Sequence, residues 1–176
     1  MGTIRGNLLQ ARGSYYGATW IFDVERAEIV AGPFRKLEEN SRIWTIKHAP
    51  GPDEPARAVA LGEWHGRVVA AIGHLRQAEV FDLENGDRIG STRTGSSDTV
   101  AVALAESEGR ALLATGSDGG TVTLWEGPSM KELASITLDV GVRDLWLASN
   151  VLAVRGGDDR FHVFDLVPVS RGPTRR

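Results

Sequence analysis

A pattern of two apolar runs around a polar turn recurs along the chain and constrains its fold more than any other feature. Its clearest copy lies in residues 110–127, where the apolar runs 111–114 and 121–125 flank the small polar turn 116–120. Short apolar runs bounded by glycine-rich turns are typical of β-strands joined as hairpins. The chain is therefore expected to consist of repeated antiparallel hairpins.

An aromatic residue followed by an acidic residue marks the same point of this unit four times. The pairs are Phe22-Asp23, Phe81-Asp82, Trp125-Glu126 and Phe164-Asp165. Their spacings are 59, 44 and 39 residues, and the last two lie near the roughly 40–45 residues of a four-stranded propeller blade. The repeat therefore predicts four short strands per unit, and Asn85-Gly86 predicts a type I′ hairpin between two of them.

The strand runs at residues 68–72, 111–114 and 151–154 are apolar on both faces. A sheet with one face in water shows a cleaner alternation of apolar and polar residues. Strands with two apolar faces are instead expected between two neighbouring sheets. This pattern favours a stack of sheets over a single open meander.

The segment RAVALGEWHGRVV at residues 57–69, together with the recurring aromatic–acid pair, resembles the bacterial repeats of the WD40 family. The resemblance covers about residues 4–34 and 56–166, and it implies a β-propeller of four-stranded blades. The motifs are degenerate, because Phe stands at the family's Trp position in every repeat except that of Trp125. The family's Gly-His dipeptide before the first strand is missing.

The resemblance implies a set of residues that hold the blades together. Thr115, Asp118 and Trp125 form the most complete group, and Asp158 matches the family's turn aspartate approximately. The other members come from the aromatic–acid pairs, namely Phe22, Asp23, Phe81, Asp82, Phe164 and Asp165.

The fold class that follows is all-β, a partial β-propeller with about three and a half four-stranded antiparallel blades. The expected segments are a partial blade with strands B to D at 1–34, an insertion or linker at 35–55, complete blades at 56–95 and 96–139, a partial blade at 140–167 and a flexible tail at 168–176. A seven-blade ring needs roughly 300 residues, so this chain is too short to close a ring alone.

An open array exposes the apolar faces and the unpaired edges of its terminal sheets. Three explanations stay open at this point. Two copies can associate head-to-tail into one ring, the chain can be a truncated piece of a longer protein, or another molecule can cover the open array.

Three residues are candidates for contact with a protein partner. Trp44 and His48 lie in the insertion, and Trp64 lies in the hairpin between the first two strands of the second blade. Loops between repeated strands gather on one face, where propellers bind partners. The alternative is that Trp44 packs on a blade and the proline-rich run after it is a linker.

Composition and motifs argue against several other functions. A net charge of −3 does not suggest a nucleic-acid binder, and the lack of Cys removes disulfides and thiolate metal sites. The sequence contains no nucleophile elbow, zinc-protease motif, P-loop or dinucleotide fingerprint. No catalytic, cofactor-binding or metal-binding residue is therefore assigned. No apolar run approaches the ~20 residues of a membrane span, and a cytoplasmic location is expected.

The resemblance thus implies a non-catalytic, WD40-like scaffold for protein–protein interaction, with the C-terminal sensor piece of a larger bacterial regulator as one form of it. Two alternatives from other classes stay open. One is a propeller hydrolase or a small-ligand or glycan binder with a site that lines a central channel. The other is a degenerate remnant without a binding role.

Overall fold

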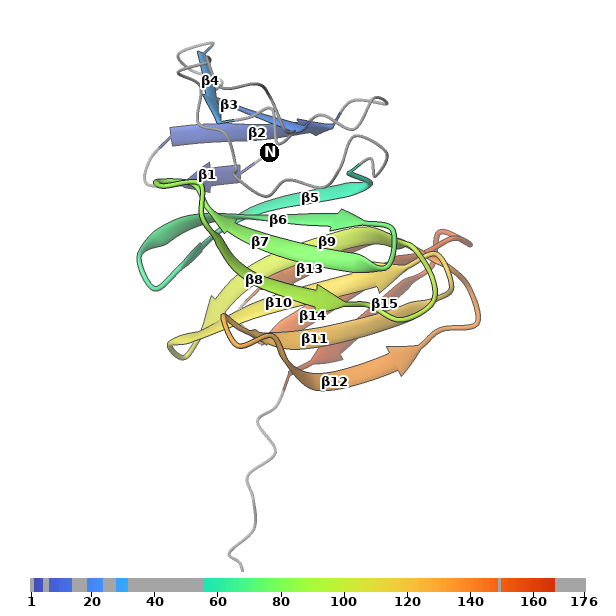
Figure 1. Ribbon diagram of the computed structural model, residues 1–176. Coiled ribbons are helices and arrows are strands. Elements are labelled where there is room, and N and C mark those ends of the chain that lie inside the picture. The colour runs from blue at the N-terminus through green and yellow to red at the C-terminus, as the bar shows by residue number, and fades with distance from the viewer. Residues whose placement is uncertain are drawn as a thin grey trace, which may run out of the picture.

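Antiparallel pairing between consecutive strands builds every sheet of this protein (Figure 1). The computed structural model describes residues 2–4, 7–13, 19–23, 28–31, 56–148 and 150–166. Within these residues the chain forms four separate sheets and no helix. The described part of the chain therefore contains no helix of the length and hydrophobicity needed to cross a membrane.

The four sheets follow one another along the chain. The first contains β1 (Gly2–Ile4), β2 (Asn7–Gly13), β3 (Thr19–Asp23) and β4 (Glu28–Ala31). The second contains β5 (Ala58–Trp64), β6 (Arg67–His74), β7 (Gln77–Asp82) and β8 (Arg88–Arg93). The third contains β9 (Thr99–Ser107), β10 (Arg110–Ser117), β11 (Thr121–Gly127) and β12 (Lys131–Thr137). Among the described residues the fourth has three strands, β13 (Val142–Ala148), β14 (Val151–Gly156) and β15 (Phe161–Asp165).

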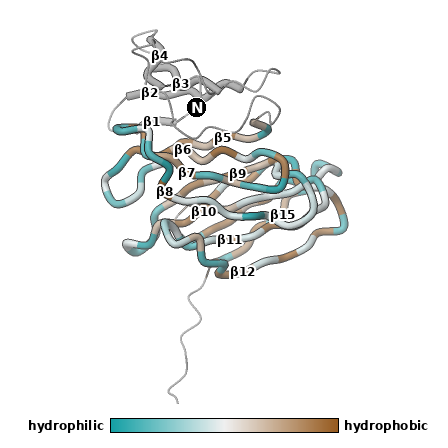
Figure 2. The backbone as a smooth tube through the Cα atoms, in the orientation of Figure 1, coloured by the Kyte–Doolittle hydropathy of each residue, from teal (hydrophilic) through white to brown (hydrophobic). Residues whose placement is uncertain are grey.

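The sheets lie one on another in chain order, with their first strands close together. β9 contacts both β5 and β13, and β1 and β2 contact β5. Figure 1 shows the resulting stack, from the blue first sheet to the red fourth sheet. Hydrophobic residues follow mainly the strands and hydrophilic residues mainly the turns (Figure 2).

Two apolar cores fill the spaces between the later sheets. The core between the second and third sheets includes Val69 and Leu113, and the core between the third and fourth sheets includes Val122 and Leu145. In β6, residues 69–72 are all fully buried, so both faces of this strand are covered. Complete burial of one Val, Leu or Ile side chain stabilises the fold by about 1.5–3 kcal/mol.

The recurring aromatic residue occupies an equivalent position in successive sheets. In each four-stranded sheet, the pairing of the third and fourth strands shifts register at one point, which is Ile21/Phe22, Val80/Phe81 and Leu124/Trp125. Trp125 packs into the core on the side of the preceding sheet, and Phe164 of β15 packs in the same direction. Phe81 is fully buried.

The acidic partner also recurs in two sheets. Arg67 begins β6 and its Nη1 lies 3.5 Å from Oδ2 of Asp82, while Arg110 begins β10 and its Nε lies 3.0 Å from Oε1 of Glu126. In the second, third and fourth sheets the acidic residue itself pairs with an apolar residue, as in Val69↔Asp82, Leu112↔Glu126 and Val151↔Asp165. The second and third sheets therefore repeat at the level of individual side chains.

Two hairpin turns repeat as well, although the predicted one does not. His65 and Gly66 both have positive φ, 50° and 76°, and the aligned Glu108 and Gly109 have φ of 51° and 73°. Positive φ at both central residues defines the type I′ turn. The prediction of such a turn at Asn85-Gly86 was wrong, because the β7–β8 connection spans residues 83–87 and only Gly86 in it has positive φ.

The first sheet has one strand more than the sequence predicts. Strands B to D were expected for residues 1–34, whereas β1 adds a further strand that pairs with β2 from Gly2↔Leu9 to Ile4↔Asn7. A strand of three residues is too short to show a period of two, so backbone pairing alone reveals it. The predicted insertion at 35–55 and the tail at 168–176 lie outside the described residues.

The fourth sheet lies within the partial blade predicted at 140–167, but the burial of β14 differs from the prediction. Leu152 and Val154 of β14 are buried, whereas Val151 and Ala153 are only half-buried. The expectation that both faces of 151–154 are covered was therefore wrong. One face lies on the third sheet, and no described sheet lies on the other face.

Close approach of the sheets makes a prediction about Gly116. A Cβ at this position would lie 2.6 Å from Cγ1 of Val142 in the next sheet, so we expect Gly116→Ala to lower the free energy of unfolding by about 1–3 kcal/mol. The control is Gly157→Ala, whose Cβ would meet nothing nearer than a carbonyl oxygen at 3.4 Å. Its effect should stay within about 0.5 kcal/mol. Urea unfolding followed by circular dichroism measures both, and equal losses would contradict the packing argument.

Candidate interaction surface

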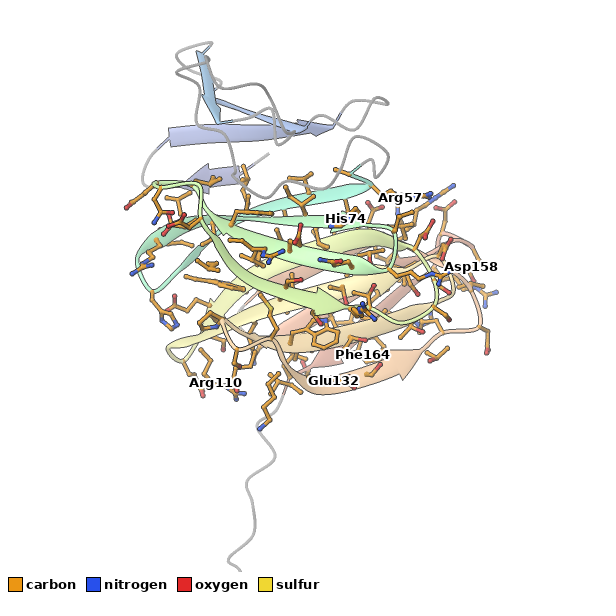
Figure 3. All side chains as sticks on the ribbon, viewed as in Figure 1. Arg57, His74, Arg110, Glu132, Asp158 and Phe164 are labelled. Atoms are coloured by element: carbon orange, nitrogen blue, oxygen red, sulfur yellow. The ribbon has the colours of Figure 1, made fainter. Side chains whose placement is uncertain are left out.

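Antiparallel strands bring the connections alternately to two opposite edges of the stack. At one edge, here named the loop edge, lie the described residues 56–57, 75–76, 94–98, 118–120, 138–141 and 157–160. Figure 3 shows Arg57 and Asp158 at this edge and Arg110 at the opposite one. The loop edge therefore gathers segments from three sheets.

Backbone hydrogen bonds connect five of these segments, from 75–76 to 157–160, each to the next. The N–H of Thr94 donates to Arg76 O (2.9 Å), that of Asp118 to Asp98 O (3.0 Å), that of Leu138 to Gly120 O (3.0 Å) and that of Gly157 to Gly141 O (2.7 Å). The N–H of Asp98 also donates to Oδ1 of Asp118 at 3.0 Å. Loops held in this way have little conformational freedom to lose when a partner binds.

The loop edge carries charges of both signs. Arg57 lies 2.9 Å from the Asp98 carboxylate, and Arg143 lies 3.0 Å from that of Asp159. Arg160 is highly exposed beside them. Ion pairs as exposed as Arg143–Asp159 contribute about 0–1 kcal/mol to stability, so their charges remain available for contacts with another molecule.

A groove of about 680 Å³ runs along the first strands of three sheets. Its walls are residues 57–61 of β5 and the preceding loop, 100–104 of β9 and 143–148 of β13. Most of these residues are Ala, Val or Leu, and the titratable ones are Arg57, Arg143 and Asp144. The Asp144 carboxylate accepts a hydrogen bond from Nε of Arg155 at 2.8 Å. Among the described residues, no three acidic or His side chains come together as metal ligands.

Of the three residues that the sequence groups together, the structure brings two into direct contact. Nε1 of Trp125 donates to Oγ1 of Thr115 at 2.9 Å, and the Thr115 hydroxyl donates to the Thr123 carbonyl at 3.4 Å. Asp118 lies apart from this buried pair, exposed in the β10–β11 turn, and bonds to Asp98. It therefore connects loops of the loop edge.

Asp158 lies in the β14–β15 turn, which is equivalent to the turn of Asp118. Its Oδ1 accepts the N–H of Arg160 at 3.2 Å, within its own turn. The two aspartates thus share a place in the repeat but have different partners.

Of the three predicted partner-contact residues, Trp64 is the one that lies among the described residues. Trp64 is only 2 % exposed, because its ring lies over Gly127 of the next sheet, so this candidate was wrong. Trp44 and His48 lie outside the described residues. Within the part of the chain that the structure describes, the exposed large aromatic rings are those of Trp146 and Phe161, with centroids 5.8 Å apart. The sequence signal for an exposed Phe161 was the alternation of side chains between the two faces of the strand 161–165. Alternation alone does not reveal which of the two faces another sheet covers.

A buried charged cluster lies within the second sheet. Oε1 of Glu79 accepts a hydrogen bond from Nη1 of Arg88 at 2.6 Å and one from Gln77 at 3.2 Å, while Oε2 lies 3.3 Å from Nε2 of His74. Burial raises the pKa of the Glu79 carboxyl, but hydrogen bonds and positive charge from His74 and Arg88 outweigh burial and leave its pKa below the usual value. A buried carboxylate that is already fully paired serves to hold the sheet together.

No family model and no curated protein matches this chain. Among solved structures 984 chains match, so the arrangement of its strands is a recurring one. The crystal structure of the computationally designed Ika4 protein is one such match, with a TM-score of 0.58 and 15% identity. The match covers 90% of this chain and 86% of that chain. At this identity the similarity shows the fold alone.

The Trp125–Thr115 hydrogen bond allows a comparison with a second buried tryptophan. We expect Trp125→Phe to lower the free energy of unfolding by about 1–2 kcal/mol more than Trp64→Phe. Both changes remove the same indole area, but Trp125 Nε1 donates a hydrogen bond, whereas Nε1 of Trp64 has no partner among the described residues. Chemical denaturation of both variants measures the difference. Equal losses would show that the hydrogen bond contributes nothing net.

The lowered pKa of Glu79 predicts a dependence of stability on pH. Because its folded-state pKa lies below its unfolded-state value, the Glu79 carboxylate stabilises the fold above about pH 4.5 and loses this effect as the pH falls through the folded-state value. We expect Glu79→Gln to be less stable than the wild type at pH 7 and the gap to narrow below about pH 4.5. Urea titrations from pH 7 to pH 3 measure the gap, and a constant gap would contradict the prediction.

Proposed function

We propose that this protein is a non-catalytic scaffold for protein–protein interaction, built from WD40-like propeller blades. The repeated register shift before the aromatic residue and the Trp125–Thr115 hydrogen bond support the assignment of the sheets as blades. The observation that carries the function is the chain of hydrogen bonds linking five loops of the loop edge. It supports a rigid surface that a partner can bind at low entropic cost.

The chemistry of the loop edge and the groove favours a protein as the partner. Acidic and basic side chains alternate along the edge, whereas nucleic acid prefers a surface of positive charge. The residues along the groove are mainly aliphatic in type, although the surface that they expose there is more polar than apolar, and the titratable residues of its walls are in ion pairs.

Charge reversal at the loop edge tests this proposal. Proteins captured from an extract of the source organism are purified, and their affinities for the wild type and for Arg143→Glu are measured by calorimetry. We expect a genuine partner to bind Arg143→Glu at least about tenfold more weakly, which corresponds to about 1.4 kcal/mol.

Arg110→Glu is the matched control. Arg110 is also a half-exposed arginine in a 3.0 Å ion pair, but it lies at the opposite edge of the stack. The affinity of the partner for this variant should stay within about twofold of the wild type, or about 0.4 kcal/mol. Captured proteins that respond to neither variant, or equally to both, would overturn the proposal.

A further inference from the structure

The outer face of the fourth sheet is the most hydrophobic exposed surface of the described residues. Phe161 and Val163 of β15 are 63 % and 66 % exposed, and Trp146 of β13 is 49 % exposed. The register places Trp146, Ala153 and Val163 in one row across the three strands. Ala153 is small and leaves space beside the rings of Trp146 and Phe161, whose centroids lie 5.8 Å apart.

The charged residues on this face lie in its two outer rows, Asp144 and Arg155 in one row and Asp165 in the other. Arg155 lies between Asp144 and Phe161 in the next row, and its guanidinium binds the Asp144 carboxylate. The centre of the face therefore carries no unpaired charge. A neutral, aromatic centre with ion pairs at its margin suits the face of another sheet.

The other sheets of the chain show what covers such a face. The corresponding face of the second sheet, with Val69 and Val80, packs on the third sheet. That of the third sheet, with Leu112 and Val122, packs on the fourth. In both positions the cover is the following sheet of the same chain, so the outer face of β13–β15 is built to receive a sheet of this kind.

The strands and turns of one sheet take up more residues than follow β15 in this sequence. The strands of the third sheet, with their turns, occupy residues 99–137, whereas ten residues, 167–176, follow the described part of the fourth sheet. These ten include Pro168 and Pro173, which cannot donate backbone hydrogen bonds within a strand. The first sheet, β1–β4, lies at the opposite end of the stack.

We propose that the outer face of β13–β15 binds the β1–β4 sheet of a second copy of this chain. The two copies then exchange identical contacts, so that each first sheet continues the stack of the other chain and the assembly closes as a two-fold symmetric dimer. Trp146, Phe161 and Val163 form the centre of each contact. This inference rests on the stacking of the sheets and not on the function proposed for the loop edge.

Sedimentation and light scattering of the purified chain at about 100 μM, well above a micromolar dissociation constant, test the proposal. We expect a single species of twice the mass of the chain. Val163→Glu should convert it to monomer, because burial would leave the new carboxylate without a partner. The control, Ala134→Glu, adds the same charge to an exposed residue of β12 outside this face and should remain dimeric. A monomeric wild type, open-ended larger assemblies, or a Val163→Glu dimer would each overturn the proposal.

Two further measurements do not depend on the folding of a charged variant. In the wild type, the backbone amides of Phe161–Asp165 should exchange more slowly as protein concentration rises, and unchanged exchange would contradict the contact. The chain has no Cys, so Val163→Cys introduces a unique thiol. Head-to-tail packing keeps the two thiols of a dimer apart, whereas a disulfide-linked dimer under mild oxidation would show that two outer faces meet and would overturn the proposed arrangement.

Discussion

Burial of apolar sheet faces against one another is the interaction on which the rest of this structure depends. The sheet β5–β8 has fully buried residues on both faces, Val69 and Ala71 on one and Ala70 and Ile72 on the other. A sheet with this composition is stable only between two covers, because in water either face would expose a row of apolar side chains. Each sheet therefore depends on its neighbours, and the stack is the unit that folds.

Small residues set how closely the sheets approach. Gly62 meets Leu104, Gly116 meets Val142 and Gly127 meets the ring of Trp64, each across a sheet boundary and with no space for a Cβ. A register shift also precedes two large buried side chains, Phe81 and Trp125, and Trp125 packs against the preceding sheet. Close packing and repeated irregularities together give successive sheets the same shape.

The same stacking determines which surfaces are available. It places five loops side by side at the loop edge, where backbone hydrogen bonds join them into one rigid rim. It also leaves the last sheet with one covered and one open face, so aromatic residues that would be core residues in an inner sheet become exposed. The two proposed contacts of this protein, with a partner at the loop edge and with a second copy at β13–β15, both arise from this arrangement.

The grouping of Thr115 with Trp125 followed from the family resemblance, whereas local patterns in the sequence were sufficient for the strands and for the recurrence of the aromatic–acid pair, because alternation and turn residues act over a few neighbouring positions. They were not sufficient for β1. This strand has only three residues, and its pairing with β2 is what reveals it. They also failed for Trp64. Its position in a hairpin suggested an exposed side chain, but the ring is buried over Gly127, which lies 63 residues away in the sequence. The sequence by itself determined that this protein is a series of antiparallel hairpins with apolar faces. Only the tertiary structure decided which of those faces are covered, because burial depends on the sheet that lies opposite, and that sheet comes from a distant part of the chain.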